Sequence, residues 1–303
     1  MKYIKEIAAF RAEQNSVVTL GKFDGVHRGH RKLIRRVLET AGEKGWTPTV
    51  FTFDVSPQAA LGIARPQMLM TNREKRDFLE QLGIAVLVEC HFTDLKDMEA
   101  EDFVREILVG RLKASHFVVG PDFHFGKNRR GNPEFLKSLG ESMGFTVEVP
   151  AKEMDGDREI GSSYIREELQ QGHIEKVNSL LGYSYFITGQ VVHGRRQGRR
   201  FGFPTINLVP SPEKLLPPRG VYASRTEIGG QVFRGVSDLG RKPTVHGEFD
   251  GLETYLFQCS RDLYGLQAKV ELQTFLRPEK KFPSVEELKR QLKNDVKAAE
   301  QIL

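Results

Sequence analysis

The chain has 303 residues, of which 39% are hydrophobic and 28% are charged, and its net charge is +5 at pH 7. The length predicts about two domains, and the composition is that of an ordinary globular protein. Cys90 and Cys259 are the only cysteines and lack metal-ligand spacing, which argues against a disulfide framework or a zinc site. The mild positive charge favours anionic ligands such as nucleotides and phosphates, although it also fits weak affinity for nucleic acid.

The N-terminal segment, residues 1–14, carries charged side chains and no apolar stretch, so we expect no signal peptide. No apolar run approaches the ~20 residues needed to span a bilayer. Two unpaired thiols suit a reducing compartment. We therefore expect a cytoplasmic protein with neither a membrane partner nor a nucleic-acid partner.

Residues 1–182 alternate short apolar strands with amphipathic helices. The predicted strands are 17–20, 49–53, 85–89, 116–119 and 146–149, and the helices between them are 31–44, 73–82, 100–112 and 133–143. This alternation predicts a doubly wound parallel sheet, in which ligands bind at the carboxyl ends of the strands. Two further helices, 162–171 and 174–181, end this half.

A glycine-rich segment joins the first predicted strand to the first helix; it reads Gly21-Lys22-Phe23-Asp24-Gly25-Val26-His27-Arg28-Gly29-His30. Its glycines allow close approach of a ligand, and the helix N-terminus favours phosphate. Imidazoles there can donate hydrogen bonds to phosphoryl oxygens as negative charge develops. The plainer interpretation is that one histidine caps the helix and the other packs. The segment resembles the HxGH signature of nucleotidylyltransferases, which attack the α-phosphate of a nucleoside triphosphate and release pyrophosphate.

Two later segments are further candidates for ligand binding, one after a predicted strand and one at the start of a predicted helix. The loop 119–131 contains Gly120, Asp122, Phe123, Phe125 and Gly126; it is not a P-loop, and it can hold a planar ring or form an ordinary long turn. The segment 160–166 opens a helix with Ser162 and Ser163 and continues to Arg166. These groups can clamp phosphates, and one serine can simultaneously cap the helix.

Together these three segments resemble the bacterial FAD synthetase module. The resemblance implies a transfer of AMP from ATP to FMN, with His27 and His30 as the catalytic residues. It further assigns the flavin cleft to Asp122, Phe123 and Phe125, and ATP or phosphate binding to Gly21, Phe23, Asp24, Gly25, Gly29, Ser162, Ser163 and Arg166. The sequence departs from the family pattern at Ser56, which replaces a histidine, and at Pro121 and Gly161.

Near Gly182-Tyr183 the alternation of strands and helices gives way to strands alone, which predicts domains 1–182 and 183–303. The predicted strands of the second half are 185–192, 221–227, 232–239, 253–258 and 268–275, without intervening helices. This pattern predicts an antiparallel β-barrel or sandwich. Ser284 then caps a terminal helix that extends toward Ile302.

The first loop of this half is rich in glycine and arginine, and we expect it to bind ATP phosphates through Gly194, Arg195, Gly198 and Arg199. Thr205 and Asn207 alternate on an extended segment and share one face, where their neutral oxygens suit Mg²⁺ bound to ATP. Glu253 can accept a proton from a hydroxyl that attacks the γ-phosphate. Taken singly, the arginines fit a solvated loop and Glu253 fits an exposed strand residue.

This half resembles the riboflavin kinase module, through Gly202-Phe203-Pro204-Thr205-Ile206-Asn207, the segment 240–244, Glu253 and Asp262-Leu263-Tyr264-Gly265. The whole chain thus resembles the bacterial bifunctional riboflavin kinase/FAD synthetase family, which implies the substrates riboflavin, FMN and ATP, with Mg²⁺. Three alternatives stay open: a kinase with a degenerate adenylyltransferase half, another nucleotidylyltransferase, and a non-catalytic flavin-binding regulator.

Overall fold

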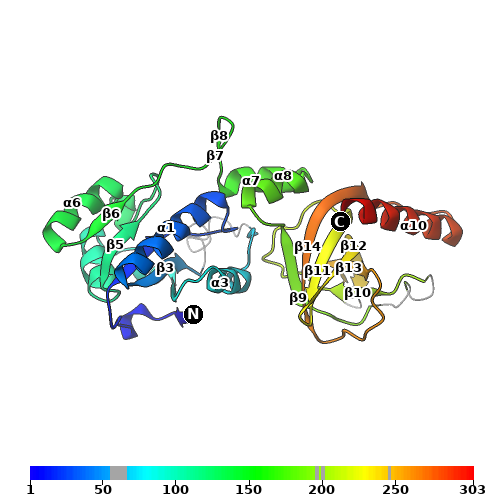
Figure 1. Cartoon of the computed structure of the whole chain (residues 1–303), viewed down its shortest axis with the longest axis horizontal. Coiled ribbons are helices and arrows are strands. Elements are labelled where there is room, and N and C mark those ends of the chain that lie inside the picture. Colours follow the sequence, from blue (N-terminus) through cyan, green and yellow to red (C-terminus); the bar gives the residue numbers. More distant parts are fainter. Residues whose placement is uncertain (55–66, 195–197, 199–201, 245–246) are drawn as a thin grey trace. The chain divides into compact units, whose positions relative to one another are not determined.

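The computed structural model describes residues 1–54, 67–194, 198, 202–244 and 247–303. The described chain forms two compact units, Met1–Ser162 and Ser163–Leu303, which Figure 1 colours from blue to green and from green to red. The predicted phosphate-binding residues Arg195 and Arg199, and the departure at Ser56, lie outside the described residues.

The first unit is built on a parallel sheet with the strand order β1-β4-β3-β2-β5-β6. Its strands are β1 (Lys2–Ile4), β2 (Ser16–Leu20), β3 (Thr47–Phe53), β4 (Val86–Cys90), β5 (Ala114–Val118) and β6 (Thr146–Glu148). The chain leaves β2 for β3 on one side and later returns to β5 on the other side. The carboxyl end of β2 is therefore the switch point where such sheets bind ligands. The predicted doubly wound sheet is confirmed.

Helices connect these strands as the periodicity predicts. They are α1 (Arg28–Lys44), α3 (Asn72–Gln81), α4 (Phe92–Leu95), α5 (Ala100–Asp102) and α6 (Pro133–Met143). The helix predicted over 100–112 continues from α5 as a π-helix, Phe103–Val109. Two short pairings were not predicted: β1, and the hairpin of β7 (Met154–Asp155) with β8 (Arg158–Glu159). Strands this short carry too few residues for a period to show.

In its described residues, the second unit contains two helices, a six-stranded antiparallel sheet and a terminal helix. Its elements are α7 (Ser162–Gln170), α8 (Ile174–Leu181), β9 (Phe186–Gln190), β10 (Thr205–Leu208), β11 (Gly220–Ile228), β12 (Gln231–Thr244), β13 (Gly247–Leu256), β14 (Gln267–Pro278) and α10 (Val285–Ile302). The strand order is β10-β13-β12-β11-β14-β9. Beyond β9, the Val192 N–H donates to the Asn207 carbonyl at 2.9 Å, so the two edges of the sheet meet and form the predicted barrel.

Hydrogen bonds and an ion pair join the helices at both ends of the second unit to the barrel. Asn178 of α8 donates through Nδ2 to the Leu272 carbonyl at 2.9 Å and accepts at Oδ1 from the Tyr185 N–H at 2.7 Å. Arg277 of β14 pairs with Asp295 of α10 at 2.7 Å. The second compact unit therefore begins before the predicted boundary near Gly182-Tyr183, because α8 packs against β14.

Candidate active sites in the two units

The segment between β2 and α1 forms a strained turn at the switch point of the sheet. Phe23, Gly25 and Val26 have φ angles of +50°, +79° and +35°. A positive φ is a genuine outlier for a β-branched residue and persists only where the surrounding structure fixes it. Such strain is typical of ligand-binding turns, and here it places two histidines at the start of α1.

His27 and His30 form one compact pair. His27 caps α1, and its Nδ1 accepts a hydrogen bond from the His30 backbone N–H at 3.4 Å. The two imidazole rings stack with centroids 3.7 Å apart and planes inclined by 23°. A Cβ on Gly29 would lie 3.3 Å from the His27 ring, so a glycine there leaves room for the stack. The predicted capping role of one histidine is therefore correct, and it leaves both rings together at a helix N-terminus.

Both imidazoles are held in the neutral form. Burial lowers the pKa of His27 to about 4. Burial, the neighbouring His27 and the Lys75 ammonium hold the pKa of His30 well below its ordinary value. A neutral imidazole that accepts at Nδ1 carries its proton on Nε2, so His27 is a hydrogen-bond donor there. Among the described residues, none hydrogen-bonds the buried Nδ1 of His30. A buried polar atom without such a partner is typical of a site that a ligand completes.

Of the other residues predicted at this turn, Phe23 contacts a histidine ring, and Asp24 and Ser162 are hydrogen-bonded to each other. Phe23 is fully buried, and its ring lies 5.0 Å from the ring of His30. Asp24 accepts at Oδ1 from the Met70 N–H at 3.3 Å, and its carbonyl accepts from the Ser162 hydroxyl at 2.9 Å. Ser162 is thus brought to the turn that it was predicted to join. Ser163 is exposed and Arg166 is half-buried, and both belong to the second unit; their grouping with His27 stays a prediction.

The aromatic loop follows β5, the strand beside β2. Asp122 is exposed and forms an ion pair with Lys152. The Phe123 ring stacks on the Phe125 ring at 5.3 Å with an inclination of 17°. Phe125 is only 7% exposed, and a Cβ on Gly131 would lie 2.6 Å from its ring. Phe125 therefore packs in the core, whereas Asp122 and half-buried Phe123 lie nearer the surface of the loop.

The barrel brings the predicted metal-binding and catalytic residues onto adjacent strands. Asn207 of β10 lies directly opposite Glu253 of β13, and Thr205 lies two residues before Asn207 on the same face. Asp238 of β12 lies opposite Glu253 on its other side. Directly paired residues of an antiparallel sheet share a face with their Cβ atoms about 5 Å apart. Asn207, Glu253 and Asp238 are half-buried and form a row of polar side chains across β10, β13 and β12, and half-buried Thr205 lies on the same face of β10.

Gly194 and Gly198, which were predicted to bind phosphate, lie close to Asn207 and to Phe203 respectively. A Cβ on Gly194 would lie 2.6 Å from the Asn207 side-chain amide. Gly198 accepts a hydrogen bond from the Phe203 N–H at 2.9 Å, and a Cβ there would lie 2.2 Å from the Phe203 carbonyl oxygen. A side chain at position 198 would clash with the backbone of Phe203, and one at position 194 would displace the Asn207 side chain.

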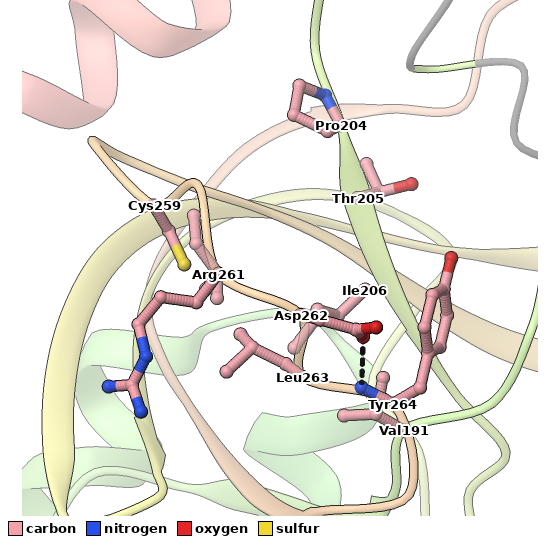
Figure 2. Close-up of a pocket in the computed structure, with 10 residues that line it drawn as sticks. Val191, Pro204, Thr205, Ile206, Cys259, Arg261, Asp262, Leu263 and Tyr264 are labelled. Carbon is pink, nitrogen blue, oxygen red and sulfur yellow. Dashed lines mark hydrogen bonds between the residues drawn. The ribbon is translucent and has the colours of Figure 1, made fainter.

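A pocket opens beside Thr205, as Figure 2 shows. Asp262 and Tyr264 line it, and the Tyr264 N–H donates to Asp262 Oδ1 at 3.1 Å. Arg261 also lines the pocket and donates to Gln231 Oε1 at 2.6 Å. The sequence motif marked Asp262 and Tyr264, but Arg261 was not predicted, because a lone arginine before a turn reads as a solvated charge.

The described ranges contain neither a clustered set of metal-ligating side chains nor a membrane-spanning helix. Within those ranges, no group of three or more His, Cys, Asp and Glu side chains is arranged to hold a metal ion. Thr205 and Asn207 carry neutral oxygens of the kind that bind a divalent cation together with oxygens from its substrate. No helix in the described part of the chain is long and apolar enough to cross a bilayer.

Comparisons with known proteins match both halves separately and the chain as a whole. The FAD synthetase family matches residues 9–164, and the riboflavin kinase family matches residues 181–303. A bifunctional riboflavin kinase/FMN adenylyltransferase of Bacillus subtilis is 38% identical over 294 residues, which cover 95% of this chain and 92% of the relative. The enzyme of the same name from Haemophilus influenzae is 35% identical, with 96% and 95% covered.

A solved structure matches the chain over nearly its full length. It is a crystal structure from Streptococcus pneumoniae named as a macrolide-efflux protein, with a TM-score of 0.89 and 30% sequence identity. The match covers 98% of this chain and 98% of that chain. The architecture of both units is therefore shared with a protein of known structure.

Proposed function

This chain belongs to the bifunctional riboflavin kinase/FMN adenylyltransferase family, and on that premise we propose which residues carry its two reactions. The enzyme phosphorylates riboflavin to FMN with ATP, and it transfers AMP from ATP to FMN, which gives FAD and pyrophosphate. Because both halves match their families, neither a different nucleotidylyltransferase nor a non-catalytic regulator is needed to explain the sequence.

Residues 1–182, the predicted adenylyltransferase domain, transfer the adenylyl group. An FMN phosphate oxygen attacks the α-phosphorus of ATP, and the bond from that phosphorus to the oxygen bridging to the β-phosphate breaks. His27 and His30 donate hydrogen bonds to the α-phosphoryl oxygens as their charge grows. Ser162, Ser163 and Arg166 hold the leaving pyrophosphate. The observation that supports this assignment best is the stack of two neutral imidazoles at the N-terminus of α1.

The flavin and the remaining ATP contacts lie around the same switch point. Asp122 and Phe123, on the loop after β5, contact the flavin, and Gly21, Gly25 and Gly29 let the phosphates approach the backbone of the turn. The packing of Phe125 in the core makes its contribution indirect, through the ring of Phe123.

The second unit phosphorylates riboflavin. Glu253 removes the proton from the attacking riboflavin hydroxyl, whose oxygen takes the γ-phosphoryl group while ADP leaves. Thr205 and Asn207 would hold Mg²⁺, which supplies charge neutralisation and alignment of the polyphosphate. Their hard, neutral oxygens beside the Glu253 carboxylate fit that ion. The loop that includes Gly194, Arg195, Gly198 and Arg199 binds the ATP phosphates.

The kinase domain begins near Gly182-Tyr183, and the enzyme is cytoplasmic. The family match that starts at residue 181 supports this boundary. The free thiols of Cys90 and Cys259 fit a reducing compartment. We expect no nucleic-acid or membrane partner.

The double variant His27→Ala with His30→Ala tests the assignment. The full chain is incubated with riboflavin, ATP and Mg²⁺, and FMN is separated from FAD. FAD formation should disappear while FMN accumulates as an end product. A variant that makes FAD as fast as the parent would overturn the role of the histidines.

A further inference from the structure

A chain of buried polar groups lies at the carboxyl ends of β3 and β4. The Lys75 ammonium of α3 lies 3.4 Å from Glu89 Oε1 and donates to Thr52 Oγ1 at 3.4 Å. Thr52 and Glu89 face each other in the sheet register, and all three residues are at most 4% exposed. We call Lys75, Glu89 and Thr52 the Lys75 network. The Tyr3 hydroxyl donates to the second carboxylate oxygen of Glu89 at 2.5 Å and holds that end of the network.

The Lys75 network reaches the turn that carries His27 and His30. The Thr52 hydroxyl donates to the Lys22 carbonyl at 3.3 Å, and Lys22 is the residue before the first positive φ of the turn. The segment just before α3 makes a second link to the same turn, because the Met70 N–H donates to Asp24 Oδ1 at 3.3 Å. Two hydrogen-bonded connections thus run from the α3 segment to the strained residues 22–26.

Stability alone does not account for this arrangement. A buried ion pair gains little net stability, since the cost of removing two charges from water offsets their attraction, and apolar replacements are often as stable. A turn with positive φ at Val26 needs surroundings that fix it. The Lys75 ammonium also lies close enough to help hold the pKa of His30 down, after burial and His27. The network therefore contacts the backbone of the turn, and its ammonium lies within electrostatic range of His30.

We propose that Lys75 is a positioning residue for adenylyl transfer, which acts through Thr52 and the Lys22 carbonyl on the turn that carries His27 and His30. The inference rests on the proposed role of the two histidines. A misplacement of about 1 Å at reacting groups can cost about 10²-fold in rate. Loss of the network should consequently slow the chemical step more than it weakens substrate binding.

The first test compares Thr52→Val with Thr52→Ser in the full chain. Valine has nearly the shape of threonine but no hydroxyl, whereas serine keeps the donor. Thr52→Val should lower kcat for FAD formation from FMN about ten- to hundred-fold with little change in KM. Thr52→Ser should restore most of kcat, and FMN formation by the same molecules should equal that of the parent.

A second variant, Lys75→Met with Glu89→Leu, removes the ion pair without leaving a buried charge unpaired. It should fold, as read from the fluorescence of Trp46, the only tryptophan, and it should share the low kcat of Thr52→Val. It decides the question even where Thr52→Val fails to fold.

Three results would overturn the inference: a parental kcat in the folded Lys75→Met/Glu89→Leu variant, equal loss of kcat in the valine and serine variants of Thr52, or an equal fall of both reactions. The double histidine variant is measured in parallel. If it loses FAD formation while the network variants keep it, only the inference fails; if it keeps FAD formation, the proposed function of the turn fails.

Discussion

Lowering the pH should reduce the free energy of unfolding of the first unit through His27. A single substitution of His27 should remove this part of the pH dependence. His27 is 5% exposed, and burial lowers its pKa from 6.5 to about 4. Between these two values the unfolded chain binds a proton at His27 and the folded chain does not. Stability from this group is therefore complete above the unfolded pKa and falls as the pH drops toward the folded pKa.

The magnitude follows from the difference between the two pKa values. Each pH unit within this window is worth about 1.4 kcal/mol per group, so a change from about pH 7 to about pH 5 should lower the free energy of unfolding by about 2 kcal/mol through His27 alone. His30 should also lower the free energy of unfolding as the pH falls, because its pKa is lowered in the folded chain as well. His27→Asn keeps a good helix N-cap and does not titrate, so it serves as the matched control.

The assay is urea unfolding of the full chain, followed by the fluorescence of Trp46. This is the only tryptophan, and it lies just after α1 in the first unit, so its signal reports that unit. From the higher to the lower pH, the free energy of unfolding of the parent should fall by about 2 kcal/mol more than that of His27→Asn. Other titrating groups are common to both proteins and largely cancel. Equal pH dependence of the two proteins would show that His27 is not held neutral by burial.

Three further predictions concern the kinase unit. Glu253→Gln should reduce FMN formation about 10²–10⁴-fold, while FAD formation from supplied FMN persists; kinase activity within a few-fold of the parent would assign Glu253 a structural role. Thr205→Val should raise the Mg²⁺–ATP requirement of the kinase only, and an unchanged Mg²⁺ titration would remove Thr205 from the metal site. A fragment 183–303 should phosphorylate riboflavin, yet unfold at a lower temperature than a fragment 163–303, because it lacks the two Asn178 hydrogen bonds, each worth about 1 kcal/mol. Equal melting temperatures would contradict a stabilising role for α8.

The architecture was largely predictable because it depends on local periodicity. Apolar runs and amphipathic helices predicted the parallel sheet, and the absence of such helices predicted the barrel. The short strand β1 was missed, since it owes its conformation to pairing with β4, where Lys2 lies opposite Val86. Likewise, β10 was predicted only as an extended segment. Its pairing with β13, which sets Asn207 opposite Glu253, depends on a register that no local pattern contains.

The candidate site residues stand out in the sequence, whereas the groups that contact them do not. Lys75 lies in a highly charged segment, Asn72-Arg73-Glu74-Lys75-Arg76, which on its own reads as a solvated helix face. Its burial arises from strands that approach it only in the folded sheet. One signal was present in the sequence: Glu89 interrupts the apolar strand Val86–Cys90, and a carboxylate inside such a strand requires a partner. A buried carboxylate therefore predicts a buried cation, and here that cation is Lys75 of α3, which is linked through Thr52 to the Lys22 carbonyl.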